Sequence, residues 1–101
     1  MKILSKKIIN KYKNRILNIH PSLLPKYKGL NTHKRVILNK ENFTGCTVHL
    51  VNYKLDSGKI ILQKKIRVLK KDNEKTLAIR LLKIENKLYP RAVKKFIATN
   101  L

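Results

Sequence analysis

An asparagine and a histidine, Asn18 and His20, stand two residues apart in a short apolar run over residues 16–20. The run contains β-branched residues and stops at Pro21, so it predicts a short strand. Alternate residues of a strand point to the same face, which brings an amide donor and an imidazole to one spot. Such a pair can stabilise a developing oxyanion and move protons. A lone Asn-x-His is more often a structural polar pair on a strand, so its context decides.

The context is the segment Asn18-Ile-His-Pro-Ser-Leu-Leu-Pro-Lys-Tyr-Lys-Gly29, which resembles the signature of the folate-dependent formyltransferases. The continuation Gly29-Leu-Asn-Thr-His33 is similar to the phosphoribosylglycinamide formyltransferases, whereas the methionyl-tRNA formyltransferases usually carry a small-residue and proline segment there. Three later segments also match this family in order and spacing: Thr44-Gly-Cys-Thr-Val-His-Leu-Val51, Leu55-Asp-Ser-Gly-Lys-Ile-Ile-Leu-Gln63 and Ile84-Glu-Asn-Lys-Leu-Tyr-Pro90. The resemblance covers essentially the whole chain.

The resemblance implies an enzyme that transfers the formyl group of 10-formyltetrahydrofolate to the amine of 5-phosphoribosylglycinamide, in de novo purine (IMP) biosynthesis. It makes Asn18, His20 and Asp56 the catalytic residues: Asn18 binds and polarises the formyl group, His20 donates a proton, and Asp56 tunes His20. Asn18 and Asp56 would contact the folate, and His20 and Glu85 the ribonucleotide. No metal is implied.

The resemblance also indicates what this sequence lacks. Glycine occurs only at positions 29, 45 and 58, so the chain has no Gly-rich loop to hold a substrate phosphate. Formyltransferases carry that loop in their amino-terminal half. We therefore predict one partial domain over residues 1–101, the carboxy-terminal, catalytic half of an α/β formyltransferase fold, with a short mixed sheet and flanking helices. Its partner would be either a missing amino-terminal half or a second copy.

Several candidate residues also have a structural interpretation. Asp56 alone is typical of a turn, because Asp-Ser-Gly is favourable turn chemistry. Glu85 alone is typical of a solvated helix residue or a salt-bridge partner of Lys83 or Lys87. His49 is expected to be a satisfied sheet histidine rather than a catalyst, and His33 to be part of a helix start or loop. Cys46 is expected to be a small core residue, and no His/Cys/Asp cluster has metal-ligand spacing.

The formal net charge of +20 is the least ordinary feature of the composition. It favours an anionic partner, and suits a methionyl-tRNA formyltransferase or a polyanion-binding module. The missing amino-terminal half leaves a further alternative, an inactive truncated remnant. The cations are spread along the chain rather than gathered in a stripe, which indicates a general lysine bias and no specific nucleic-acid partner. One cysteine excludes an internal disulfide, and no apolar run approaches a membrane span, so we expect a cytoplasmic protein without a membrane partner.

The remaining pattern predicts the elements that position these residues. Ser5 would cap a first short helix, and a helix capped by Asn31 or Thr32 would run to about Asn39. Strands are predicted over residues 46–51 and 60–68, joined by a turn at residues 56–58. Asp72 or Asn73 would cap a long helix that Pro90 kinks or restarts. Its apolar stripe would be Leu77, Leu81, Ile84 and Leu88, continued by Val93, Phe96 and Ile97.

Overall fold

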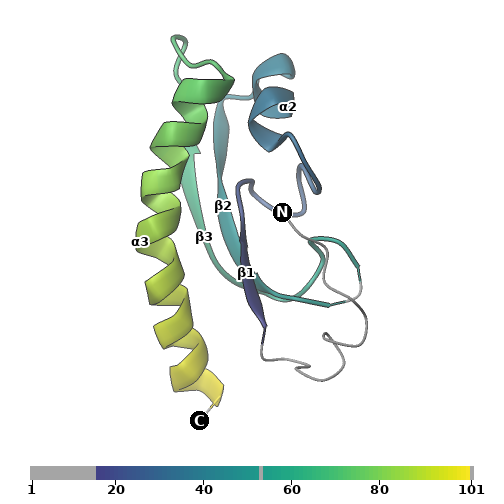
Figure 1. Ribbon diagram of the computed structural model, residues 1–101, viewed down its shortest axis with the longest axis vertical. Coiled ribbons are helices and arrows are strands. Elements are labelled where there is room, and N and C mark those ends of the chain that lie inside the picture. The colour runs from purple at the N-terminus through teal and green to yellow at the C-terminus, as the bar shows by residue number, and fades with distance from the viewer. Residues whose placement is uncertain (1–15, 53, 101) are drawn as a thin grey trace.

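The computed structural model describes residues 16–52 and 54–100, so the helix expected after Ser5 lies outside the described residues. Figure 1 shows α3 running along one face of the sheet, with α2 near one end of the sheet. None of the described helices has the length and apolar character that crossing a membrane requires. In chain order the elements are β1 (Leu17–His20), α2 (Thr32–Leu38), β2 (Phe43–Leu50), β3 (Ile60–Arg67) and α3 (Glu74–Asn100).

The strands form one three-stranded sheet in the order β1-β2-β3. The predicted α/β organisation is confirmed, but the predicted mixed sheet is wrong for the described residues, because both strand pairs are antiparallel. A parallel pair needs a crossover of a dozen or so residues along the sheet. The loop over residues 51–59 is too short for that crossover and simply returns β3 beside β2.

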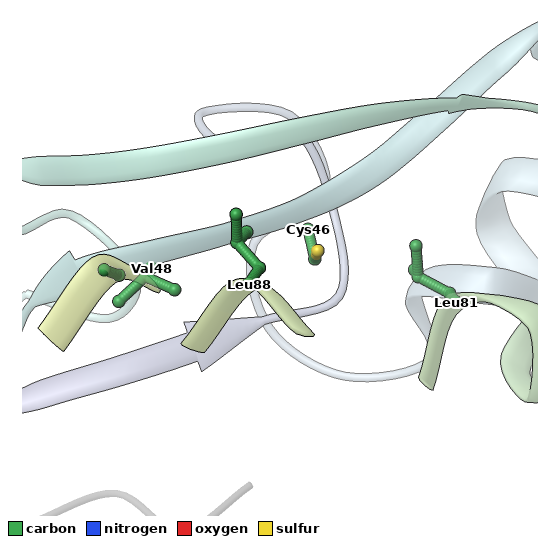
Figure 2. Packing of buried hydrophobic residues seen from close by; sticks show 5 residues of the cluster. Cys46, Val48, Leu81 and Leu88 are labelled. Atoms are coloured by element: carbon green, nitrogen blue, oxygen red, sulfur yellow. The ribbon is translucent and has the colours of Figure 1, made fainter. Parts of the chain in front are cut away.

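The hydrophobic core lies between α3 and the sheet. Leu81, Leu88 and Ala92 of α3 pack on Cys46 and Val48 of β2, and all five side chains are buried (Figure 2). Each fully buried leucine contributes about 1.5–3 kcal/mol relative to an exposed one. The predicted stripe is therefore confirmed at its centre, and this face of α3 fixes the sheet.

The helix ends follow local chemistry. Asn73 caps α3: its Oδ1 accepts the Thr76 N–H at 2.9 Å, and Thr76 Oγ1 accepts the Asn73 N–H at 2.9 Å. Asn31 precedes α2 in a left-handed conformation, without a capping bond from its side chain. The predicted restart at Pro90 is wrong, because α3 continues through it. The proline removes only one hydrogen bond, and buried residues on both sides of it hold the helix on the sheet.

Candidate active site

Strand β1 directs Asn18 and His20 to the sheet face opposite α3. Leu17 and Ile19 pack on the core, so the residues alternating with them point the other way. In the antiparallel register Asn18 lies opposite His49 of β2. His20 and His49 are only 1% and 3% exposed. The sheet therefore places two buried imidazoles and the Asn18 amide on one surface.

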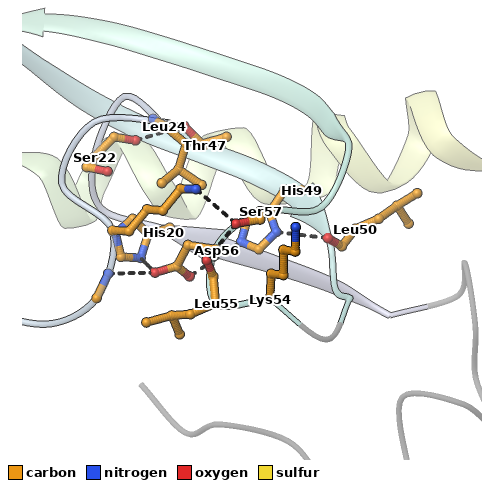
Figure 3. A network of polar contacts seen from close by, with 12 residues as sticks. His20, Ser22, Leu24, Thr47, His49, Leu50, Lys54, Leu55, Asp56 and Ser57 are labelled. Atoms are coloured by element: carbon orange, nitrogen blue, oxygen red, sulfur yellow. Dashed lines mark hydrogen bonds and ion pairs between the residues drawn. The ribbon is translucent and has the colours of Figure 1, made fainter. Parts of the chain in front are cut away.

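Asp56 reaches the same surface from the loop between β2 and β3 (Figure 3). Its backbone is left-handed, with φ of 50°, and the residue is 5% exposed. Gly58 lets the loop return closely to β2, because a Cβ there would lie 1.5 Å from the Leu50 carbonyl oxygen. The Gly29 N–H, at a φ of 86°, donates to Asp56 Oδ2 at 2.8 Å. Two glycine-dependent turns thus hold one buried carboxylate.

The Asp56 carboxylate lies between the two imidazoles. Its Oδ2 is 3.4 Å from His20 Nδ1, and its Oδ1 is 3.9 Å from His49 Nε2. The opposite ring nitrogens face backbone carbonyls: His20 Nε2 is 2.8 Å from the Tyr27 oxygen, and His49 Nδ1 is 3.0 Å from the Leu50 oxygen. A carbonyl can only accept, so those nitrogens carry the hydrogens.

This arrangement sets how the cluster responds to a proton. A neutral His20 or His49 turns a lone pair towards Asp56, and neither facing nitrogen has a hydrogen-bond partner within the described ranges. Protonation of either ring converts its facing nitrogen into a donor towards the carboxylate. The cluster can therefore accept a proton on an imidazole and hold it as an ion pair.

Burial lowers the pKa of His20 below its ordinary value of 6.5. The hydrogen bond to the Tyr27 carbonyl and the Asp56 carboxylate both raise this pKa, whereas the charges of His49 and Arg35 lower it further. The expected influence of a carboxylate on His20 is present, because Asp56 raises its pKa. Burial lowers that pKa by a larger amount. Burial therefore favours the neutral form of His20, and the Asp56 carboxylate partly opposes this effect.

The loop over residues 21–29 is fastened to the sheet, which fixes the two backbone groups that contact the cluster. Thr47 Oγ1 donates to the Ser22 carbonyl at 2.7 Å and accepts the Leu24 N–H at 3.1 Å (Figure 3). Ser22 Oγ donates to the Lys26 carbonyl at 2.6 Å. These bonds hold the Tyr27 carbonyl against His20 Nε2. The loop over residues 21–29 therefore keeps the His20 imidazole in the tautomer that carries its hydrogen on Nε2.

A cavity of about 510 Å³ runs along β1 and α2. Burial lowers the pKa of His33 on its wall, while the nearby Glu74 raises it. Glu85 is absent from this lining; it is half-buried on α3, where burial raises its pKa. The structure thus brings Asn18, His20 and Asp56 together and leaves Glu85 apart. The lining residues are Asn18, Ile19, His20, Pro21, Gly29, Leu30, Asn31, Thr32, His33 and Glu74.

Three participants in this site were not predicted from the sequence. His49 was expected to be a satisfied sheet histidine, yet only its Nδ1 is bonded, and its Nε2 faces Asp56. The available signal was strand alternation: His49 lies two residues after Thr47, so the two side chains project from the same face of β2. The Tyr27 carbonyl and the Gly29 N–H are backbone groups, and residue type does not indicate where a backbone group will point.

The other candidate chemistries find little support in the structure. Cys46 is fully buried, and burial, with the Glu85 charge, raises its pKa to about 12, which leaves it an unreactive thiol. Among residues 16–52 and 54–100 there is no group of three or more His, Cys, Asp or Glu side chains that could hold a metal ion.

Comparison with known proteins identifies relatives over almost the whole chain. A family model for formyl transferase matches residues 1–93. The phosphoribosylglycinamide formyltransferase of Haemophilus influenzae is 45% identical over 96 residues, which are 95% of this chain and 45% of that protein. The chain therefore spans about half the length of this curated relative.

Solved structures agree with the sequence comparison. The phosphoribosylglycinamide formyltransferase of Brucella melitensis is 50% identical, with a TM-score of 0.87 over 95% of this chain and 49% of that one. The enzyme of the same name from Anaplasma phagocytophilum is 42% identical, with a TM-score of 0.90 over 93% of this chain and 46% of that one. By family match, identity and fold, this chain belongs to the formyl transferase family.

Proposed function

We propose that this chain is the catalytic half of a phosphoribosylglycinamide formyltransferase. The reaction would transfer the formyl group of 10-formyltetrahydrofolate to the amine of 5-phosphoribosylglycinamide, within purine biosynthesis in the cytoplasm. The observation that carries the proposal is the buried His20–Asp56 pair, 3.4 Å apart, next to Asn18 in a formyl transferase chain. Both relatives with solved structures described above bear the name of this activity.

The geometry supports a specific division of labour among these residues. Asn18 and His20 both line the cavity along β1, so a formyl group there meets an amide donor and an imidazole together. Attack by the substrate amine builds negative charge on the formyl oxygen and positive charge on nitrogen. Asn18 would stabilise the oxygen. His20 would take the proton of the attacking amine, with Asp56 stabilising the imidazolium, and donate it to the folate nitrogen as the bond between that nitrogen and the formyl carbon breaks. The cavity provides room for the reacting ends of both substrates.

The role of Glu85 is a separate part of the proposal. The carboxylate would bind the ribonucleotide, through its ribose hydroxyls or its amine. Its half-burial on α3, away from the lining of the β1 cavity, requires the ribonucleotide to extend from the catalytic cluster towards α3.

The test is formyl transfer by the purified protein, followed as release of tetrahydrofolate in the presence of the ribonucleotide. Circular dichroism first establishes that the chain is folded. We expect His20→Ala to lower the turnover by about 100-fold or more, the scale of lost general acid-base or electrostatic help. Turnover by His20→Ala at the wild-type rate would refute the assignment.

A polyanion-binding role is the second candidate, because the net charge of +20 favours it. It predicts binding to any polyanion, without sequence preference, that weakens steeply as salt rises. A folded chain that shows this binding but no turnover, alone or with the family's amino-terminal half, would be a remnant rather than an enzyme.

A further inference from the structure

The Tyr27 carbonyl, which faces His20 Nε2 at 2.8 Å, belongs to a residue with an uncommon backbone. Tyr27 has a φ of 56°, in the left-handed region that residues with a side chain seldom adopt. Such a conformation persists only where the surrounding contacts determine it. The contacts of the Tyr27 side chain therefore bear on the direction of the carbonyl that fixes the hydrogen of His20.

Helix α2 and the residues after it hold the Tyr27 side chain. The Arg35 guanidinium lies over the Tyr27 ring, 5.4 Å from its centroid, and the hydroxyl donates to Glu41 Oε2 at 2.9 Å. A cavity of about 460 Å³ opens beside Tyr27 and Glu41, so packing does not enclose the ring. Desolvation raises the pKa of the Tyr27 hydroxyl, its bond to Glu41 raises it further, and the Asn39 side chain lowers it. The hydroxyl therefore keeps its hydrogen and stays a donor to Glu41.

The end of α2 fixes the position of Glu41. The Glu41 N–H donates to the Val36 carbonyl at 3.2 Å. The Lys40 N–H donates to the Ile37 carbonyl at 3.1 Å, and Lys40 is left-handed, with a φ of 52°. These two bonds close the helix in a Schellman motif. Val36 is buried, so α2 is anchored in the interior and Glu41 projects from a fixed helix end.

We propose that Glu41 is a positioning residue for formyl transfer: through the Tyr27 hydroxyl it holds the Tyr27 carbonyl on His20 Nε2. The neutral His20 ring has one hydrogen and two competing acceptors, the Tyr27 carbonyl at Nε2 and Asp56 Oδ2, 3.4 Å from Nδ1. The carboxylate is the stronger acceptor of the two. If the carbonyl withdraws, the hydrogen moves to Nδ1, which can then no longer accept the proton of the attacking amine. The role in transfer rests on the proposed function.

The first readout is the tautomer of His20, measured by NMR from the chemical shifts of its two ring nitrogens in the isotope-labelled, folded chain, at a pH where the ring is neutral. We expect the wild type to carry the hydrogen on Nε2. Tyr27→Phe keeps the ring under Arg35 and removes only the hydroxyl, so it should move the hydrogen to Nδ1, as should Glu41→Ala. Glu41→Gln keeps an acceptor for the hydroxyl and should retain the Nε2 form.

The second readout is formyl transfer by the same variants. Tyr27→Phe and Glu41→Ala should each lower kcat by about tenfold, the scale of one hydrogen bond to a charged group. KM should stay within about twofold, because neither side chain belongs to the lining of the 510 Å³ cavity. Glu41→Gln should keep kcat near wild type. The matched control is Lys26→Met: Lys26 Nζ lies 3.4 Å from the same Glu41 Oε2 but is 67% exposed, so its loss should leave the tautomer and kcat unchanged.

The outcomes separate the role of Glu41 from the activity itself. The proposal is overturned if the wild type carries its hydrogen on Nδ1, or if Tyr27→Phe and Glu41→Ala retain the Nε2 form or the wild-type kcat. An equal effect of Lys26→Met would also overturn it, because the effect would then not pass through Tyr27. A folded wild type without turnover, alone or with the family's amino-terminal half, would refute the proposed function. The tautomer is measured without substrate, so it would still decide whether Glu41 positions Tyr27.

Discussion

Replacing Asp56 by asparagine tests the cluster with the least disturbance of its shape. Asparagine tolerates the left-handed backbone at φ of 50° and keeps an oxygen to accept the Gly29 N–H. The change therefore removes the negative charge, which lies 3.4 Å from His20 Nδ1 and 3.9 Å from His49 Nε2, and places an amide NH2 on the side of His49. With that charge gone, the pKa of His20, already lowered by burial, should fall further.

The expected magnitude follows from the distance. Unit charges about 4 Å apart interact by about 4 kcal/mol at an effective dielectric constant of 20, before the costs of desolvation are subtracted. If about two-thirds of this survives in the transition state, transfer slows by about 100-fold. The assay is single-turnover release of tetrahydrofolate, by the chain alone or with the amino-terminal half, whichever is active.

A matched control is available elsewhere in the chain. Asp72 is also a mostly buried aspartate with a cationic partner, Arg80, at 2.6 Å, but it does not line the cavity. Asp72→Asn should cost about 1 kcal/mol of stability, as loss of a helix-end interaction does, and leave the rate of transfer near wild type. If Asp56→Asn remains within about threefold of wild type while folded, the charge is not used in the transition state.

The pKa directions and burial support three further predictions. The folded-state pKa of His20 is lowered, so its contribution to stability is present above the unfolded value of 6.5 and is lost as the pH falls through the folded value. Chemical denaturation across this pH range should show the loss of stability. The variant His20→Gln should reduce that loss. Burial raises the pKa of Glu85, so its contribution is present below the unfolded value near 4.5 and lost as the pH rises through the folded value. Glu85→Gln should accordingly raise the melting temperature at pH 7 but not at pH 4, while raising the KM for the ribonucleotide; an unchanged KM would remove Glu85 from the substrate site. The buried Cys46 thiol, with a pKa of about 12, should react with a thiol reagent only as fast as the chain unfolds, and rapid labelling of the native protein would contradict the packing of β2.

Local patterns were sufficient to predict most of the elements. The strand ending at His20, the β2–β3 pair and the long helix on its leucine stripe all follow from periodicity and breakers, and the structure confirms them. The antiparallel direction of the sheet was missed, although the short connection over residues 51–59 already excludes a parallel β2–β3 pair. Pro90 was predicted to kink or restart the helix, but α3 continues through it, because packing on both sides of it outweighs one missing hydrogen bond.

The site was harder to predict than the fold, for a physical reason. Asn18 and His20 are neighbours on one strand, so spacing alone places them together. Asp56 is brought to His20 by two turns that depend on Gly29 and Gly58, and only the family resemblance indicated that pairing. The contributions of the Tyr27 carbonyl and the Gly29 N–H depend on backbone direction, which sequence does not display.

The carbonyls around the two imidazoles determine which ring nitrogens of the cluster carry hydrogens. The Tyr27 and Leu50 carbonyls fix the hydrogens of His20 and His49 on the sides away from Asp56, so both rings face the carboxylate without a donor while they are neutral. A buried anion facing two lone pairs is unfavourable, and one added proton relieves it by creating an ion pair. Under the proposed function that proton comes from the attacking amine, and His20 is the ring beside the cavity. The loop over residues 21–29 holds His20 in this tautomer. It therefore leaves Nδ1 of His20 free of hydrogen and able to accept the proton during transfer.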